Sequence, residues 1–148
     1  MLKKPTLLRC AVLAALLLPA AAHAEAENAK PLIGWRRDFQ NVAEPGRPAE
    51  EGGKPLLLRF HARWCGPCRV MDARVWPDAE VARAVNERFT PVEIDIDSPD
   101  AAALARQYGI IGVPTIVLLN REGREVARAN FMSPEQMMAF LKSGAAAR

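Results

Sequence analysis

Cysteine and histidine are scarce in this 148-residue chain, which has three cysteines and two histidines. A small secreted scaffold held by disulfides would carry several cysteine pairs, and a structural zinc site needs four ligands. Beyond two closely spaced thiols, the chain after residue 24 offers only His61 as a further cysteine or histidine ligand for zinc. We therefore expect no disulfide scaffold, no metal centre and no cofactor.

Long apolar runs are also lacking. The apolar run at 11–18 is short for a bilayer span, which takes about 20 residues. Basic residues precede it, and Ala-His-Ala at 22–24 is a small-x-small cleavage site. This pattern is typical of a secretory signal, so we expect residues 1–24 to be removed and residues 25–148 to form one domain. An uncleaved anchor is the alternative; cleavage would leave no stable membrane insertion.

A charge excess is absent once this signal is set aside. The signal holds three of the 20 basic residues, and the remaining 17 equal the 17 acidic residues. A nucleic-acid-binding domain usually shows a basic surplus. We therefore expect no nucleic-acid partner.

The sequence does contain the pentapeptide Trp-Cys-Gly-Pro-Cys at 64–68. An apolar run at 56–60 comes directly before it and predicts a buried strand. Pro67 suits the first turn of a helix, and Gly66 separates it from the first cysteine. The pentapeptide therefore lies where a strand passes into a helix.

Two thiols three positions apart on a helical first turn share one face and can close a disulfide ring. Cys65 would lie at the helix N-terminus, where unsatisfied amides and the helix dipole favour a thiolate. A thiolate is the nucleophile of disulfide exchange, and Cys68 can release the resulting mixed disulfide. The pair predicts redox chemistry rather than a structural disulfide or half of a zinc site.

Hydrophobic periodicity and turn residues predict the remaining elements. We expect helices at about 34–44, from the cysteines to 76–77, from a cap at Asp78 to 89, at 98–108 and at 133–143. We expect strands at about 55–61, 91–96, 115–119 and 124–129. The order α-β-α-α-β-α-β-β-α predicts an α/β fold, a mixed sheet with helices on both faces.

With the pentapeptide at 64–68 and this order of elements, the chain resembles the thioredoxin superfamily over about residues 34–143. The sequence at 64–68 is the thioredoxin active-site sequence, and Gly-Val-Pro-Thr at 112–115 resembles the family's cis-proline loop, which faces the cysteines. Residues 53–55 and 130–135 are similar to the C-terminal periplasmic domain of DsbD. The resemblance implies a thioredoxin fold with a central four- to five-stranded sheet.

The resemblance also implies roles for single residues. Cys65 would be the attacking thiol, and Cys68 would resolve the mixed disulfide. Pro114, in cis, would leave the backbone of Val113 free to pair with an extended substrate segment. Trp64 would form a wall of the site.

Two positions depart from the family pattern. Thioredoxins usually have a buried aspartate six positions before the first cysteine, thought to accept the resolving thiol's proton, and a lysine that partners it from the next strand. This chain has Arg59 and Glu93 at these positions. An Arg59–Glu93 pair would preserve a buried ion pair at these two positions, with the positive and negative charges exchanged. Glu93 is then either the proton acceptor or only a structural partner.

Other cationic groups lie near the motif. His61 either packs beside the site or tunes the thiolate, because its charge changes near neutral pH. Residues 52–71 contain no acid but four basic residues. These form either a solvated rim or a field that favours the Cys65 thiolate, which would make the disulfide more oxidising.

These observations predict a periplasmic thiol–disulfide oxidoreductase that reduces protein disulfides through its Cys-Gly-Pro-Cys dithiol. Its partners would be protein thiols and disulfides. A reductase in an oxidising compartment must be recharged, which implies a membrane electron donor of the DsbD type. The alternatives are an oxidase that introduces disulfides and a binding module with unused cysteines.

Overall fold

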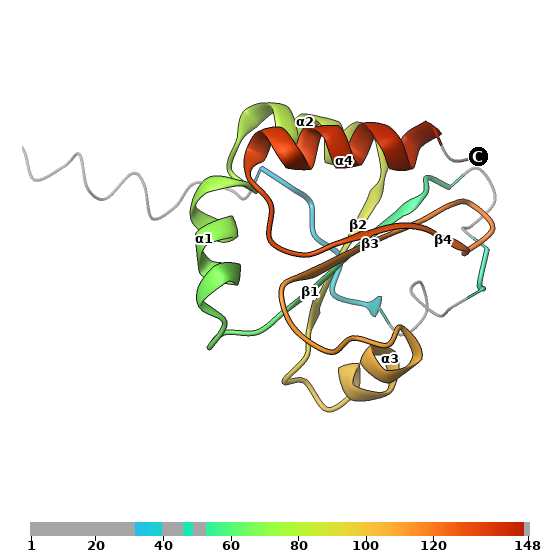
Figure 1. Ribbon diagram of the computed structural model, residues 1–148. Helices are drawn as coiled ribbons and strands as arrows, with labels where there is room; N and C mark the ends of the chain where they lie inside the picture. Colours follow the sequence, from blue (N-terminus) through green and yellow to red (C-terminus); the bar gives the residue numbers. More distant parts are fainter. Residues whose placement is uncertain (1–31, 40–45, 49–52, 147–148) are drawn as a thin grey trace, which may run out of the picture. The chain divides into compact units, whose positions relative to one another are not determined.

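The computed structural model describes residues 32–39, 46–48 and 53–146 (Figure 1). A four-stranded mixed sheet lies at its centre, with strand order β2-β1-β3-β4. β1 is parallel to β2 and antiparallel to β3, and β3 is antiparallel to β4. The strands are β1 (Leu56–His61), β2 (Thr90–Asp95), β3 (Thr115–Leu119) and β4 (Glu125–Ala129). The prediction of a mixed α/β sheet is confirmed, with four strands.

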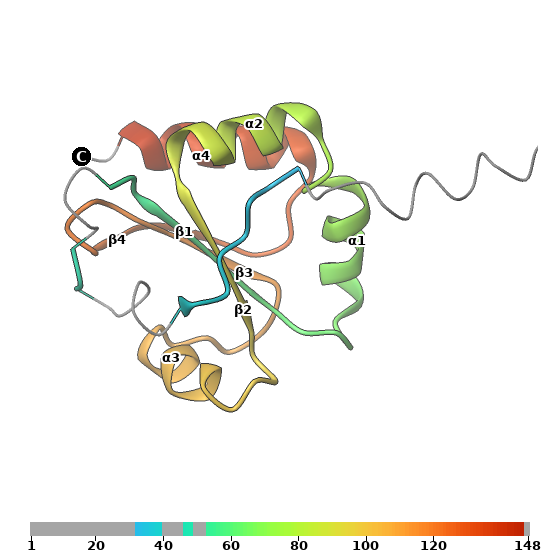
Figure 2. The same cartoon turned by 180° about the vertical axis from the view of Figure 1, so that it is seen from behind.

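Helices cover both faces of this sheet (Figures 1 and 2). They are α1 (Gly66–Arg74), α2 (Ala79–Arg88), α3 (Ala101–Gln107) and α4 (Pro134–Ala146). α1, α2 and α4 pack on the face that carries Leu57, and α3 packs on the face that carries Leu58 and Phe60. Because side chains alternate along a strand, β1 supplies both cores and is buried at nearly every position.

Two helix starts have side-chain caps, and the cap at Asp78 is the predicted one. The Asp78 carboxylate accepts hydrogen bonds from the amides of Glu80 and Val81, each at 3.0 Å. The Ser133 hydroxyl accepts from the Gln136 amide at 3.3 Å, and the Gln136 side chain accepts from the Ser133 amide at 2.9 Å. Such caps satisfy amides that have no partner inside the helix. They fix where α2 and α4 begin.

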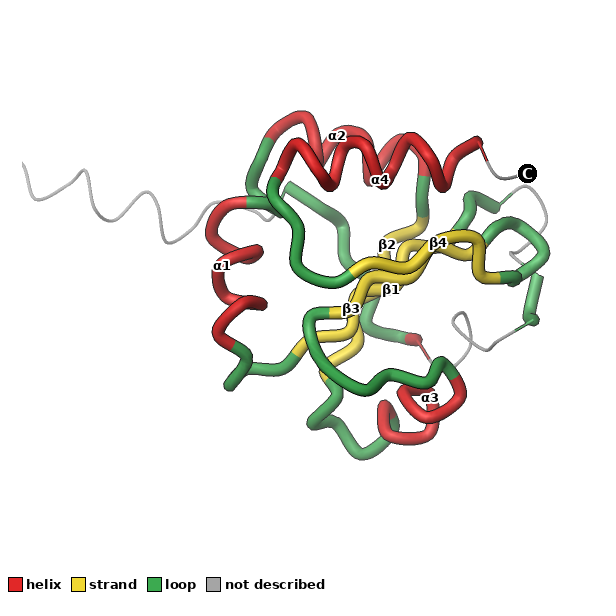
Figure 3. Tube along the Cα trace, viewed as in Figure 1, coloured by secondary structure: helices red, strands yellow, loops and turns green. Residues whose placement is uncertain are grey.

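The expected helix at 34–44 is wrong for residues 34–38, and residues 40–45 lie outside the described residues. Figure 3 shows this segment as a loop along β2. The Arg36 amide donates to the Pro91 carbonyl at 2.9 Å, and the Glu93 amide donates to the Arg36 carbonyl at 2.8 Å. The edge of β2 offers backbone groups that need partners, and this pairing overrides the helical spacing of the aromatic residues.

The helix expected from 98 also begins later. α3 starts at Ala101, and Asp100 occupies the cap position. The Ser98 amide donates to the Asp95 carbonyl at 3.0 Å, and the Ala101 amide donates to the Ser98 carbonyl at 3.1 Å. These bonds form a turn that ends β2 before the helix begins.

Candidate active site

The two cysteines form a disulfide at the start of α1, with their Cα atoms 5.2 Å apart. Cys65 is the N-cap residue, and its Sγ accepts a hydrogen bond from the Cys68 amide at 3.1 Å. The relative exposures of Cys65 and Cys68 are 3% and 1%. Pro67 lies in the first turn, where no amide donor is needed. The sulfur of Cys65 thus meets the positive end of the helix.

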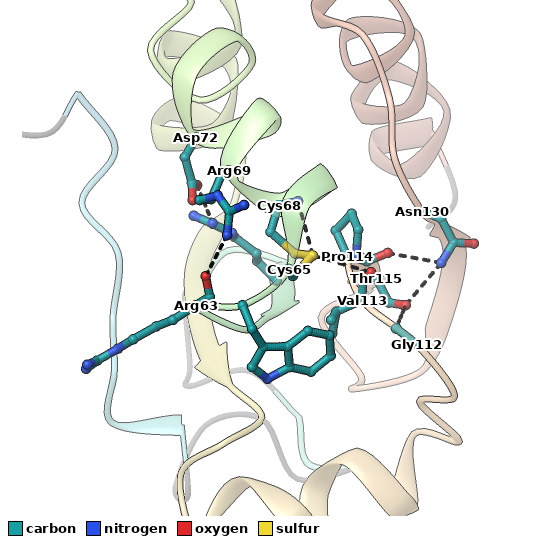
Figure 4. Close-up of a disulfide and its surroundings, with 12 residues drawn as sticks. Arg63, Cys65, Cys68, Arg69, Asp72, Gly112, Val113, Pro114, Thr115 and Asn130 are labelled. Carbon is teal, nitrogen blue, oxygen red and sulfur yellow. Dashed lines mark hydrogen bonds and ion pairs between the residues drawn. A yellow bond between two sulfur atoms is a disulfide. The ribbon is translucent and has the colours of Figure 1, made fainter.

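The loop before β3 faces this disulfide (Figure 4). The peptide bond between Val113 and Pro114 is cis. The Val113 carbonyl oxygen lies 3.5 Å from Cys65 Sγ, close enough to accept a hydrogen bond from that thiol in the reduced protein. The structure therefore brings together the two motifs that the sequence separates by more than 40 residues.

Asn130, which follows β4, holds the cis-proline loop in place. Its side-chain amide donates to the Pro114 carbonyl at 3.0 Å and to the Thr115 hydroxyl at 3.1 Å. That hydroxyl donates to the Gly112 carbonyl at 2.7 Å. Sequence reasoning assigned Asn130 no role, although an amide at the end of a strand beside β3 was a usable signal.

Trp64 lies at the rim, with 64% of its surface exposed. Its indole nitrogen donates to the Asp97 carboxylate at 3.1 Å, and the Asp97 amide donates to the Asp95 side chain at 3.1 Å. The loop after β2 therefore orients an exposed aromatic ring next to the disulfide. Asp97 could not be identified from its sequence position, because this contact depends on how that loop folds.

Arg59 is buried beneath α1, with 4% of its surface exposed. Its guanidinium group contacts the Asp72 carboxylate on α1 and lies 3.4 Å from the Glu93 carboxylate on β2. The Trp35 and Trp76 rings lie 5.5 and 5.4 Å from its central carbon. A buried cation requires such partners. Asp72 is a contact that sequence reasoning missed.

Glu93 lies among cationic side chains. Its carboxylate is 2.9 Å from Arg37 Nε, 3.4 Å from Arg59 and 3.5 Å from His61 Nε2. Burial, and then the charge of Arg59, lower the pKa of His61, and together they outweigh the opposing carboxylates. His61 therefore packs beside the ion pair as a neutral ring near pH 7.

The four basic residues of 52–71 do not form one rim. Lys54 donates to the Asn86 carbonyl at 2.6 Å, at the end of β1 away from the cysteines, and Arg59 is buried. Arg63 and Arg69 lie next to the disulfide, where the Arg69 guanidinium donates to the Arg63 carbonyl at 3.1 Å. In the described part of the chain, no three His, Cys, Asp or Glu side chains cluster to hold a metal ion.

A disulfide at a helix N-terminus, facing a cis-proline loop at the same end of the neighbouring strands β1 and β3, defines a thiol–disulfide oxidoreductase of the thioredoxin fold. Residues 47–145 match the thioredoxin-like domain family, and the chain belongs to that family.

Curated relatives support this assignment. Over 95 residues the chain is 35% identical to the thiol:disulfide interchange protein DsbD of Neisseria meningitidis; the match covers 64% of this chain and 14% of that protein. Over 91 residues it is 33% identical to a thioredoxin of Alicyclobacillus acidocaldarius, covering 61% of this chain and 80% of that one. The chain thus corresponds to a small part of DsbD and to most of a thioredoxin.

Solved structures agree. The C-terminal domain of Neisseria meningitidis DsbD in the oxidised form has a TM-score of 0.53 at 28% identity, over 62% of this chain and 80% of that one. A thioredoxin from Thermus thermophilus has a TM-score of 0.58 at 26% identity, over 68% and 86%. The predicted resemblance to thioredoxins and to this DsbD domain is confirmed. Among the described residues, no helix is long and apolar enough to cross a membrane.

Proposed function

We propose that the chain is a periplasmic reductase of protein disulfides, exported by the signal at 1–24 and active as the domain at 25–148. The observation that carries the proposal is the disulfide at the N-terminus of α1, whose Cys65 sulfur faces the cis-proline loop at 3.5 Å. The likeness to DsbD supports the assignment to the periplasm and the supply of electrons by a membrane donor of that type.

The reaction begins with the reduced pair. The Cys65 thiolate attacks one sulfur of a substrate disulfide, which forms a mixed disulfide and releases the other substrate sulfur as a thiolate. Cys68 then loses its proton to solvent and attacks Cys65 Sγ. The Cys65–Cys68 bond forms, and the second substrate sulfur leaves as a thiolate that takes a proton from water. The substrate gains two electrons, and the protein dithiol becomes the disulfide.

The surroundings position the substrate for this exchange. The backbone of Val113 pairs with an extended substrate segment, as an added strand does, and Pro114 keeps that backbone open. Trp64, fixed by Asp97, walls the side of the site next to Cys65. The dipeptide Gly66-Pro67 sets the helical turn on which the two sulfurs meet.

Insulin reduction by dithiothreitol tests the activity. The wild type should accelerate precipitation of the insulin B chain, and Cys65→Ser should reduce the rate to that of dithiothreitol alone. Equal rates for the two proteins would refute the catalytic role. A reduction potential measured against glutathione then separates a reductase from an oxidase, since a reductase needs the more negative value.

A further inference from the structure

Arg59 places a permanent positive charge beneath the active-site helix. Among the described residues it is the only charged residue that is buried. Its guanidinium group links α1 to β2 through Asp72 and Glu93, and tryptophan rings cover it. The reaction described above does not use this group, although burying it costs free energy.

Asp72 lies on the same helix as the reacting sulfurs, and its side chain is 47% exposed. It lies four residues after Cys68 on α1, and side chains four apart on a helix are neighbours on one face, with Cβ atoms about 5–6 Å apart. Figure 4 shows both residues on α1. The side chain that contacts Arg59 is therefore the neighbour of the resolving thiol. At an effective dielectric constant of about 20, an unpaired charge within about 10 Å of a thiol shifts the thiol's titration by roughly one unit or more.

We propose that Arg59 is a positioning residue for resolution: it neutralises Asp72 and thereby favours the thiolate of Cys68. The inference rests on the exchange reaction proposed above. In that reaction the Cys68 proton passes to solvent before its sulfur attacks Cys65. An uncompensated carboxylate one turn away would oppose that loss, and Arg59 cancels it.

The other charged groups around the pair do not supply this compensation. On β2, Glu93 is negative and is itself paired with Arg37. On β1, His61 is neutral near pH 7 because burial and Arg59 lower its pKa. On α1, Arg69 extends to the Arg63 carbonyl. β3 contributes the apolar Ile116 beside Arg59.

Opposite substitutions on the two sides of the Arg59–Asp72 contact distinguish a charge effect from a packing effect. In the full chain carrying Cys10→Ser and Cys65→Ser, Cys68 is the single remaining thiol. Thiolate absorbance at 240 nm is then followed against pH. We expect Arg59→Met to raise the titration midpoint of Cys68 by about one unit, and Asp72→Asn to lower it.

Three controls make the titration decisive. The single tyrosine, Tyr108, does not interfere below pH 10, because burial raises its pKa to about 12. Arg59→Lys keeps the charge and should keep the midpoint within a few tenths of a unit. On α2, Arg83→Met and Glu87→Gln remove an exposed pair of the same charges and should leave the midpoint unchanged.

Shifts of opposite sign for Arg59→Met and Asp72→Asn would support the proposal. Shifts in the same direction, or none, would overturn it, since loss of packing affects both variants alike. Should Arg59→Met not fold, an unchanged midpoint in Asp72→Asn alone overturns it. Because the titration requires no turnover, its result is independent of the insulin assay, and each can fail without the other.

Discussion

Replacement of Glu93 by glutamine tests whether this carboxylate is a structural partner of Arg59 or the proton acceptor of Cys68. The contacts favour the structural role, because the described partners of Glu93 are Arg37, Arg59 and His61.

The size of the effect follows from these contacts. The Arg37 side chain is 80% exposed, so its pair with Glu93 contributes at most about 1 kcal/mol. Arg59 is buried but keeps Asp72 and both tryptophan rings, and glutamine still offers an oxygen acceptor. We therefore expect Glu93→Gln to lower the free energy of unfolding by about 1–2 kcal/mol, less than the 3–5 kcal/mol for a buried charge left unpaired.

Two measurements check this prediction. Urea unfolding of the oxidised protein at pH 7 gives the stability loss, with Arg37→Gln as the control for the exposed contact. Resolution is measured by forming the Cys65 mixed disulfide at pH 4 and jumping to pH 7 in a stopped-flow instrument. We expect an unchanged resolution rate in Glu93→Gln. A tenfold slower resolution with unchanged stability would refute the structural role and make Glu93 the base.

Three further substitutions test other parts of the structure. Because the pKa of His61 is lowered in the folded protein, the unfolded chain binds this proton at a higher pH than the folded chain does. The free energy of unfolding should therefore fall as the pH drops through about 6.5, and it should fall less in His61→Asn. Urea unfolding midpoints measured from pH 8 to 5 check this. Asn130→Ala removes two hydrogen bonds that hold the cis-proline loop. Compared with the wild type, it should lower the free energy of unfolding by about 1 kcal/mol and raise the KM for insulin several-fold. Gly144→Ala would place a Cβ against a Leu118 methyl group in the core. Thermal unfolding should therefore show a stability loss of about 1–3 kcal/mol, whereas the exposed Ser143→Ala should show none.

The sequence was sufficient for features that depend on local chemistry. The pentapeptide at 64–68 fixed a strand-to-helix junction, and capping residues such as Asp78 marked helix starts. Alternating and continuous apolar runs located the strands, because their periods differ from that of a helix. The cis-proline loop was recognisable only by family resemblance, since spacing alone does not place it opposite the cysteines.

Contacts between distant elements could not be predicted. Trp35 and Phe39 have helical spacing, yet they pack against opposite faces of the sheet because the segment pairs with the edge of β2. The exchange of charges between Arg59 and Glu93 was visible in the sequence. The third partner, Asp72, depends on how α1 rests on the sheet, which periodicity does not determine.

In the proposed exchange, Cys65 attacks the substrate and Cys68 resolves the mixed disulfide. The most direct test is to incubate reduced Cys68→Ser and Cys65→Ser with a disulfide-bonded protein such as insulin, and to map adducts by peptide mass spectrometry without reductant. We expect a stable adduct at Cys65 in Cys68→Ser that disappears with dithiothreitol, and no comparable adduct in Cys65→Ser. Adducts that form through Cys68 instead, or in neither variant, would contradict these roles.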